Sequence, residues 1–350
     1  MLRFGLVGCG RISHRHAQLL HGDILPTASI CGVCDIIVDK AKALASQYHV
    51  PYFNDYHEMC QATNPDVLVV LTESGNHPKH VIELSKYGKP IVVEKPISLR
   101  VGDGIDMIEA CKASGSQLFV VKQNRFNRPI LKLREAVESG RFGRITLGTV
   151  RVRWCRHQSY YDQDDWRGTW SMDGGVLTNQ ASHHIDMLQW MLGDVSEVAG
   201  VGGTQMASIE AEDTATVSLR FTSGAIGAIE ATTAARPKDQ EGSISILGEN
   251  GLAEVAGIAM NEIRTWQFIE AMEIDTGIPK DYSTNPPNVY GYGHMEFYQH
   301  IINCITNGIR SDIDGNEGIK TVRIINAIYE SMRLNKFIKL RDDPRSLWFL

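Results

Sequence analysis

Residues 2–13 read Leu2-Arg3-Phe4-Gly5-Leu6-Val7-Gly8-Cys9-Gly10-Arg11-Ile12-Ser13, and this stretch decides the fold. The apolar run predicts a strand, Gly8 permits a sharp turn after it, and Gly10 lets the backbone approach a pyrophosphate. The helix predicted next offers unpaired N–H groups to the phosphate charge. Ser13 stands where Gly or Ala is usual, and it still allows close packing of the helix on the strand.

An acidic residue, Asp35, follows the second apolar run, Ala28 to Cys34. In dinucleotide-binding folds, a carboxylate at this place accepts hydrogen bonds from the ribose hydroxyls and repels a 2′-phosphate. Ile36 and Ile37 come next, so no arginine stands beside Asp35 to bind such a phosphate. We therefore predict that the chain binds a nicotinamide dinucleotide and prefers NAD to NADP. A solvated acid at a strand end is the alternative interpretation.

Length and composition are those of an ordinary globular protein. The 350 residues are enough for two domains, and 43% of them are hydrophobic and 22% charged. A net charge of −6 argues against nucleic acid as a partner, and no apolar run reaches the ~20 residues of a membrane span. The seven scattered cysteines are typical of a reducing compartment, and a first strand at residue 2 is not a signal peptide. We therefore expect a cytoplasmic protein that acts on a small molecule.

Cys31 and Cys34 have the spacing of a redox or zinc motif. A redox pair would open a helix, and a zinc half-site would need a second pair of cysteines. Both cysteines lie instead within the second predicted strand. We interpret them as small strand residues and expect no metal site.

Strand and helix signals alternate over residues 1–122. The apolar runs at 66–72, 89–94 and 117–121 are continuous, as expected of parallel strands that are covered on both faces. After Arg125, alternating runs predict strands, and amphipathic patterns predict further helices. The strands are expected at 146–154, 215–221, 225–233 and 243–247, and the helices at 130–138, 182–192, 291–307 and 316–335.

The expected fold class is therefore α/β. Residues 1–122 are predicted to form a doubly wound parallel (Rossmann) sheet that binds NAD. Residues 123–350 are predicted to form an α+β domain on a mainly antiparallel sheet, which binds the substrate and joins the subunits of an oligomer. We expect the catalytic cleft between the domains, at the carboxyl ends of the parallel strands.

Glu94-Lys95-Pro96 ends one of the parallel strands, where ligands meet such a sheet. A lysine is costly at a strand end that faces a cleft unless its charge is used. Beside a nicotinamide, the Lys95 amine could hydrogen-bond a reacting hydroxyl. The alternative is a surface lysine before a turn proline.

A second group lies in the run from Asp173-Gly174-Gly175 to Asp186. The pattern predicts a helix from about Asn179, which would place Asn179 and His183 on one face and Asp186 near His183. A neutral imidazole near the nicotinamide is a suitable base for a sugar hydroxyl. A metal site would need a third ligand at matching spacing, and a purely structural histidine is the other alternative.

The glycine turn, the Glu-Lys-Pro strand end and the Gly-Gly…His…Asp run resemble the glucose–fructose oxidoreductase / inositol dehydrogenase / MocA family, from residue 1 to about 335. The resemblance implies a catalytic group of Lys95, position 179 and His183. Asn179 cannot carry a proton, which moves proton acceptance to His183 or Lys95. The resemblance also implies the residues that bind the cofactor: Gly8, Gly10, Arg11, Ile12, Asp35, Thr72, Asn76, His77, Glu94, Lys95 and Gln123.

Within the family, residues 173–186 and the tract 285–294 look most like dehydrogenases of UDP-N-acetylated sugars. This resemblance implies NAD-dependent oxidation at C3 of UDP-N-acetylglucosamine, or of its uronic acid, to a 3-keto sugar that an aminotransferase consumes in amino-sugar synthesis for surface polysaccharide. The tract 285–294 is equally typical of a domain connector. The substrate-binding residues expected are Lys95, Arg125, Trp166, Arg167, Asn179, His183, Tyr290 and Tyr292.

Three other functions stay open: a dehydrogenase of a free sugar or inositol, an NAD-dependent glycosidase, and a non-catalytic NAD sensor. Net oxidation of the substrate separates a dehydrogenase from a glycosidase, which returns its hydride. The presence of both Lys95 and His183 argues against a sensor. We also expect a homo-oligomer, a dimer or tetramer, joined through the open face of the second sheet, because strands such as 225–231 carry little charge and need a cover.

Overall fold

The computed structural model describes residues 1–284 and 291–340, and its contacts divide the chain into two compact units. The first unit is Met1–Val121 with His294–Ile319, and the second is Lys122–Gly293 with Lys320–Leu350. The two continuous domains expected from the sequence differ from this division, because residues 294–319 pack with the first unit. The reason is visible in its core, where Tyr298 is fully buried and lies edge-on to Phe4, with ring centroids 5.9 Å apart.

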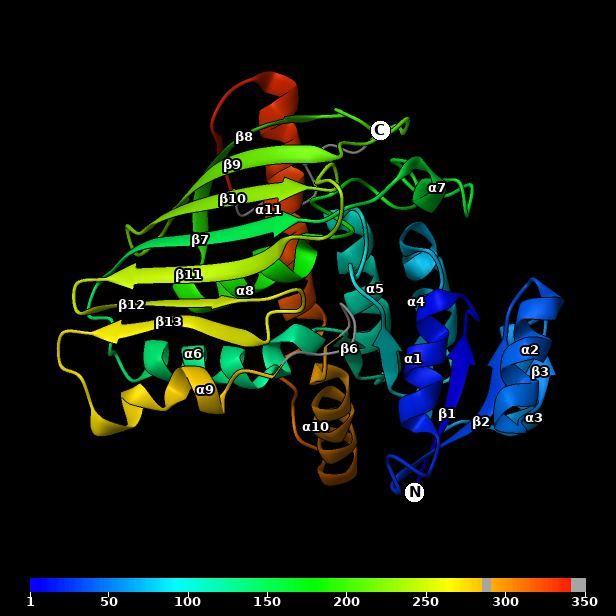
Figure 1. Cartoon of the computed structure of the whole chain (residues 1–350). Helices are drawn as coiled ribbons and strands as arrows, with labels where there is room; N and C mark the ends of the chain where they lie inside the picture. The colour runs from blue at the N-terminus through cyan, green and yellow to red at the C-terminus, as the bar shows by residue number, and fades with distance from the viewer. Residues whose placement is uncertain (285–290, 341–350) are drawn as a thin grey trace. The chain divides into compact units, whose positions relative to one another are not determined.

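The first unit contains a parallel sheet of strand order β3-β2-β1-β4-β5-β6 (Figure 1). Its strands are β1 (Leu2–Val7), β2 (Ala28–Cys34), β3 (Tyr52–Phe53), β4 (Val67–Val70), β5 (Ile91–Val93) and β6 (Leu118–Val120). Every residue of β4 and β5 has an exposed fraction of 0%, as required of strands that are covered on both faces. The doubly wound parallel sheet is therefore confirmed, and Cys31 and Cys34 lie in β2, as expected.

Helices connect these strands and set the positions of the strand ends. They are α1 (Arg11–Leu20), α2 (Val38–Tyr48), α3 (Tyr56–Thr63), η1 (Ser74–Asn76), α4 (His77–Ser85) and α5 (Val101–Ser114), and α10 (Gly293–Asn307) joins the same unit from later in the chain. The Asp55 carboxylate caps α3 by accepting the N–H groups of His57 and Glu58. Gly115 ends α5 in the left-handed conformation, which glycine adopts without a steric cost.

The second unit contains a mixed, mainly antiparallel sheet of strand order β13-β12-β11-β7-β10-β9-β8-β14. Its strands are β7 (Ile145–Arg153), β8 (Val195–Gly203), β9 (Thr214–Phe221), β10 (Ile226–Thr232), β11 (Glu241–Gly248), β12 (Gly251–Ala256), β13 (Glu262–Phe268) and β14 (Ile338–Lys339). The sequence pattern did not predict β8, β12 or β13. The β7–β10 pair is parallel, and the other pairs are antiparallel.

One face of this second sheet is apolar and buried. Its side chains include Val150, Val217 and Ile229, which belong to a continuous hydrophobic core. Figure 1 shows helices on this side of the sheet, and α8 packs against β7 and β11. The helices of the second unit are η2 (Gln123–Phe126), α6 (Arg128–Glu138), α7 (Gln158–Tyr161), α8 (Ser182–Leu192), η3 (Glu273–Thr276), α9 (Ile278–Asp281) and the later part of α11 (Gly315–Leu334).

Among the described residues, no helix combines the length and the apolar character that a membrane crossing requires.

Candidate functional site

The turn between β1 and α1 has the geometry of a phosphate-binding turn. Gly8 has a φ of +100°, and a Cβ there would lie 2.8 Å from the carbonyl carbon and oxygen of Leu71, so only glycine fits. Gly10 is the N-cap of α1, where no side chain caps the helix and a Cβ would meet nothing within 4 Å. Arg11 and Ile12 are the first residues of α1. The turn therefore leaves open space at a helix N-terminus, where the N–H groups attract a pyrophosphate.

Asp35 directly follows β2, and its carboxylate is oriented by two main-chain donors. The Cys9 N–H donates to one carboxylate oxygen at 2.7 Å, and the Ile37 N–H donates to the other at 2.8 Å. Each oxygen keeps a further lone pair, so the group can still accept hydrogen bonds from ribose hydroxyls. Ile36 is 84% exposed, and its side chain offers nothing to a 2′-phosphate. This arrangement fits NAD.

Lys95 follows β5 and is half-buried, while its neighbour Glu94 is buried. The Lys95 N–H donates to one Glu94 carboxylate oxygen at 2.8 Å, and the other oxygen lies 2.9 Å from Nε2 of His16. Burial alone would raise the pKa of Glu94, but the bond from His16 and the charge of Lys95 outweigh it and lower this pKa to about 2. The sequence pattern gave no signal for His16, because a lone helix histidine is usually structural.

Thr72, Asn76 and His77 lie at the carboxyl end of β4. The His77 ring is buried, with Nδ1 2.8 Å from the carbonyl oxygen of Pro96 and Nε2 3.1 Å from that of Thr72. Burial lowers the pKa of His77, which favours the neutral ring, and a neutral ring donates to one of these two carbonyl oxygens. His77 therefore ties the residue after Lys95 to the end of β4. Asn76 donates from its side-chain amide to Glu73 at 3.1 Å.

His183 belongs to the second unit, where it is the second residue of α8 and half-buried. The side-chain amide of Gln123 donates to Nε2 of His183 at 2.9 Å. This bond makes Nε2 the acceptor nitrogen of the neutral ring, which is the state required of a general base. Gln123 was expected to bind the cofactor, and that role stays a prediction.

The helix predicted at 182–192 is confirmed as α8, and the expectation that it begins from about Asn179 was wrong, because it starts at Ser182. Asn179 lies in a separate turn, in which its main-chain N–H bonds to Gly175 and the Ala181 N–H bonds to Val176. The side-chain amide of Asn179 donates to the Asp173 carboxylate. Asn179 thus stands before the helix, held by an acid instead of aligned with His183 along one helical face.

Asp186 lies three residues after His183 in α8, and cations bind its carboxylate. Arg125 donates two hydrogen bonds to it, at 2.7 and 2.8 Å, and Lys122 donates another. Burial would raise the pKa of Asp186, but these two cations hold it well below its usual range. Arg125 is 3% exposed and also stacks on Trp190. The expected contact of Arg125 with substrate stays a prediction.

Trp166 and Arg167, also expected to bind the substrate, lie together before the Gly-Gly turn. The Arg167 guanidinium is 4.4 Å from the Trp166 ring centroid and donates to Asp164 at 2.9 Å and to Tyr160 at 3.0 Å. Tyr292 is 43% exposed, and Tyr290 lies outside the described residues. Substrate binding by these residues stays a prediction.

Glu212 is a buried acid that the sequence pattern did not single out. One carboxylate oxygen accepts the Leu177 N–H at 2.9 Å and the Tyr329 hydroxyl at 3.0 Å. The other oxygen sits against Gly175, where a Cβ would lie only 1.9 Å from it. Burial raises the pKa of Glu212 to about 7, against the lowering effect of these hydrogen bonds. Glu212 therefore holds the turn that leads to Asn179.

Within residues 1–284 and 291–340, one set of side chains has the composition of a metal site. The ligand atoms of His16, Glu94 and His294, all buried, lie within 4.8 Å of one another. His16 and Glu94 already satisfy each other through their 2.9 Å bond.

Known protein families match both parts of the chain. Residues 2–122 match the description "Oxidoreductase family, NAD-binding Rossmann fold", and residues 134–340 match "Oxidoreductase family, C-terminal alpha/beta domain". The chain belongs to this oxidoreductase family. It is the glucose–fructose oxidoreductase / inositol dehydrogenase / MocA family that the sequence resembles, so the resemblance is confirmed. The protein is an NAD-binding oxidoreductase, in agreement with the fit of its turn and of Asp35 to the cofactor.

Other members of the oxidoreductase family are similar over nearly the whole chain. The WlbA dehydrogenase from Bordetella pertussis, solved with NADH and UDP-GlcNAcA, is 40% identical and covers 98% of this chain and 99% of its own, with a TM-score of 0.89. The WlbA dehydrogenase from Chromobacterium violaceum, solved with the same ligands, is also 40% identical. The match covers 98% of this chain and 96% of that one, with a TM-score of 0.91. The myo-inositol 2-dehydrogenase of Thermotoga maritima is 30% identical over 97% of this chain and 99% of its own.

Proposed function

We propose that this protein is an NAD-dependent dehydrogenase that oxidises C3 of a UDP-N-acetylated hexose, UDP-GlcNAc or UDP-GlcNAcA, to the 3-keto sugar. The observation that carries the proposal is the 40% identity, over 98% of the chain, to two dehydrogenases whose structures contain NADH and UDP-GlcNAcA. A second candidate is a dehydrogenase of inositol, which the 30% identical myo-inositol 2-dehydrogenase supports. A 3-keto product would suit an aminotransferase that makes an amino sugar for surface polysaccharide.

The proton of the reacting hydroxyl is handled by His183 and Lys95 in this proposal. NAD, when bound, accepts the hydride from the sugar carbon. His183 takes the proton at Nε2, where the substrate hydroxyl replaces the Gln123 amide as the hydrogen-bond donor. Lys95 donates a hydrogen bond to the same oxygen and stabilises its developing negative charge. Asn179 carries no proton and contributes by orienting the substrate, supported by its bond to Asp173.

The test is direct. The purified protein is incubated with NAD and, separately, with UDP-GlcNAc, UDP-GlcNAcA, UDP-glucose and myo-inositol, with hydroxylamine present to trap a ketone. We expect NADH formation and a trapped 3-keto sugar with an N-acetylated UDP-sugar. NADH formation with myo-inositol alone would favour the second candidate. Sugar release without net NADH would indicate a glycosidase, and NADH binding without turnover of any compound would indicate a sensor.

His183→Asn tests the assignment of the base. General-base catalysis typically contributes ~10²–10⁴-fold, so we expect turnover to fall by a factor in that range. The affinity for NADH, measured by fluorescence titration, should change little, because His183 belongs to the second unit and the phosphate turn and Asp35 belong to the first. Wild-type turnover by this variant would remove His183 from the mechanism.

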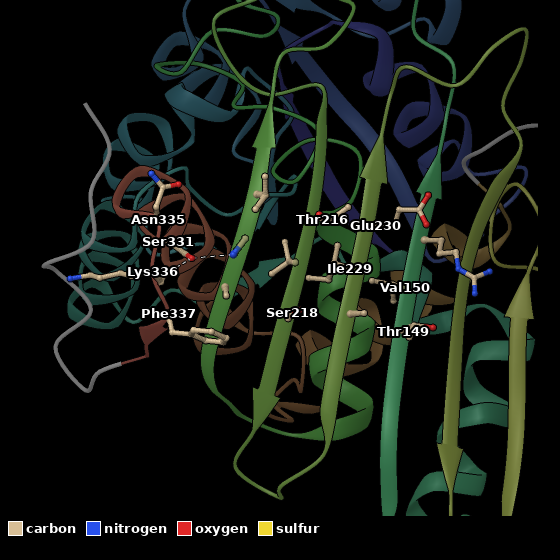
Figure 2. Close-up of a pocket in the computed structure, with 16 residues that line it drawn as sticks. Thr149, Val150, Thr216, Ser218, Ile229, Glu230, Ser331, Asn335, Lys336 and Phe337 are labelled. Atoms are coloured by element: carbon tan, nitrogen blue, oxygen red, sulfur yellow. Dashed lines mark hydrogen bonds between the residues drawn. The ribbon is translucent and has the colours of Figure 1, made fainter.

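We also propose a cytoplasmic homo-oligomer joined through the open face of the second sheet. This face carries a pocket of about 630 Å³ beside the end of α11, and Figure 2 shows its lining side chains. Val201 and Phe337, which line it, are 75% and 63% exposed. Apolar side chains with this much exposure are typical of a surface that another subunit covers. Sedimentation as a monomer at micromolar concentration would contradict the proposal.

A further inference from the structure

Three side chains that are distant in sequence form one chain of hydrogen bonds inside the first unit. The Tyr298 hydroxyl of α10 lies 2.5 Å from Nδ1 of His16, and Nε2 of His16 lies 2.9 Å from one oxygen of Glu94. The other Glu94 oxygen accepts the main-chain N–H of Lys95 at 2.8 Å. Tyr298 and His16 have exposed fractions of 0%, and Glu94 of 7%.

The direction of these bonds follows from where the hydrogens reside. The pKa of Glu94 is lowered to about 2, so its carboxylate has no hydrogen at neutral pH and can only accept. The hydrogen of the His16–Glu94 bond therefore belongs to Nε2 of His16. Burial raises the pKa of Tyr298 well above its ordinary value, so the hydroxyl keeps its hydrogen. The chain thus runs from a tyrosine of α10 to the main chain of Lys95.

Burying these three polar side chains costs folding free energy, which apolar packing alone would not require. A buried carboxylate loses its hydration, and a buried polar atom that loses its partner is left without a hydrogen bond, so both destabilise the fold. Apolar side chains of similar volume would fill the same place without that cost. These hydrogen bonds fix the peptide group of Lys95, and Lys95 is the residue whose amine hydrogen-bonds the reacting hydroxyl in the proposed function.

We propose that His16 is a positioning residue for Lys95, which it holds through the Glu94 carboxylate, and that Tyr298 orients His16. The proposal rests on the role given to Lys95 under the proposed function. Two further titratable groups among the described residues face this chain. The His294 ring lies edge-on to that of His16 at 5.6 Å between centroids, and its charge also acts on Glu94. His77 is the second, since the Glu94 charge acts on its pKa.

Two substitutions of His16 distinguish a role in positioning Lys95 from a role in packing the core alone. His16→Gln keeps a side-chain N–H that can reach Glu94, and His16→Leu keeps the volume without any donor. Tyr298→Phe removes only the hydroxyl at the far end of the chain. The matched control is Tyr87→Phe, which breaks another tyrosine–histidine bond of the first unit, 2.8 Å to Nδ1 of His57. Tyr87 precedes β5, whereas Glu94 follows it, so the control leaves the Lys95 end of the strand intact.

We expect His16→Leu to lower kcat about tenfold, the usual scale for loss of an orienting partner, while KM for NAD changes less than about threefold. His16→Gln should recover most of that loss, and Tyr87→Phe should keep the wild-type kcat. Tyr298→Phe should lower kcat by a smaller factor. Combined with His16→Leu it should add nothing further, because both residues act in one chain.

The pH profile supplies a readout that packing alone would not move. Without the His16 donor, the Glu94 charge acts more strongly on the Lys95 ammonium and favours its charged form. The limb of the kcat profile that Lys95 controls should therefore move to higher pH in His16→Leu and stay in place in His16→Gln. Equal loss of kcat in both variants with an unchanged profile would overturn the proposal, and so would a wild-type kcat in a folded His16→Leu.

Two measurements do not depend on turnover. Nitrogen NMR of labelled histidine should show hydrogen on Nε2 of His16 from pH 6 to pH 9, and loss of this hydrogen would refute the chain of bonds even if every substrate failed. Metal analysis of the purified protein should find no stoichiometric cation. One bound equivalent that His16→Leu removes would show that His16, Glu94 and His294 ligate a metal instead.

Discussion

Glu212→Gln should change how the stability of the protein depends on pH. The Glu212 side chain is 4% exposed, and one of its oxygens accepts the Leu177 N–H and the Tyr329 hydroxyl. The introduced amide keeps an oxygen that can accept both bonds, so the substitution mainly removes the ability to ionise. Any cost of placing the amide nitrogen against Gly175 is independent of pH and cancels when one variant is compared between two pH values.

The size of the effect follows from the raised pKa. An ordinary glutamate pKa of 4.5 is raised to about 7 in the folded protein, so the native state holds the proton more tightly than the unfolded state does. The resulting stabilisation is complete below about pH 4.5 and is lost as pH rises through 7. At roughly 1.4 kcal/mol for each pH unit between the two pKa values, the total is about 3 kcal/mol.

The assay is guanidinium unfolding of the wild type and of Glu212→Gln at several pH values between 5 and 8. Relative to the wild type, the variant should gain about 3 kcal/mol in free energy of unfolding across this range. Glu249→Gln is the control. Arg144 lowers the pKa of this exposed acid, so its substitution should give no gain at high pH. Parallel pH curves for the wild type and Glu212→Gln would refute the raised pKa.

Two further predictions test other parts of the site. Asp35→Ser combined with Ile36→Arg should move the ratio of kcat/KM for NADP over NAD upward by at least about tenfold, because a repulsion is removed and a phosphate partner added; a wild type that already used both cofactors equally would contradict this. Gly175→Ala should cost about 1–3 kcal/mol in free energy of unfolding, because its Cβ would meet Glu212 at 1.9 Å. Gly102→Ala in α5, where a Cβ meets nothing within 4 Å, should cost nothing, and equal losses in the two alanine variants would show that the clash is not the cause.

The cofactor end of the site could be predicted from sequence because its determinants are local. Gly8, Gly10 and Asp35 act through main-chain geometry within a few residues of themselves, and their spacing along the chain carries the signal. Lys95 could be found because it ends a strand of the parallel sheet, and such ends bind ligands. The strands predicted at 66–72, 89–94 and 117–121 correspond to β4, β5 and β6, with shifts of a residue or two at their ends, whereas α2, β3 and α3 were not predicted.

The rest depends on contacts between distant residues, for which a single sequence gives no pattern. Tyr298 and His16 are 282 positions apart, and Glu212 reaches the Gly175 turn from the segment that precedes β9. That reach also explains the error in the helix start, since Glu212 fixes the residues before Ser182 in a separate turn. Asp186 has the spacing that places it near His183 on α8, but its partners Lys122 and Arg125 lie 64 and 61 positions away in the chain, and no local pattern indicates them.

Because α10 packs with the first unit, that unit cannot complete its folding until α10 has been synthesised. Phe4 is translated first, but Tyr298, which covers it, leaves the ribosome almost 300 residues later. A nascent chain that has completed every strand of the parallel sheet therefore still lacks the Tyr298 ring that covers Phe4 and the Tyr298 hydroxyl that hydrogen-bonds His16. We expect a fragment that ends at residue 121 to aggregate or to recruit chaperones, and a permuted gene that fuses residues 293–319 ahead of residue 1 to yield a soluble NAD-binding unit.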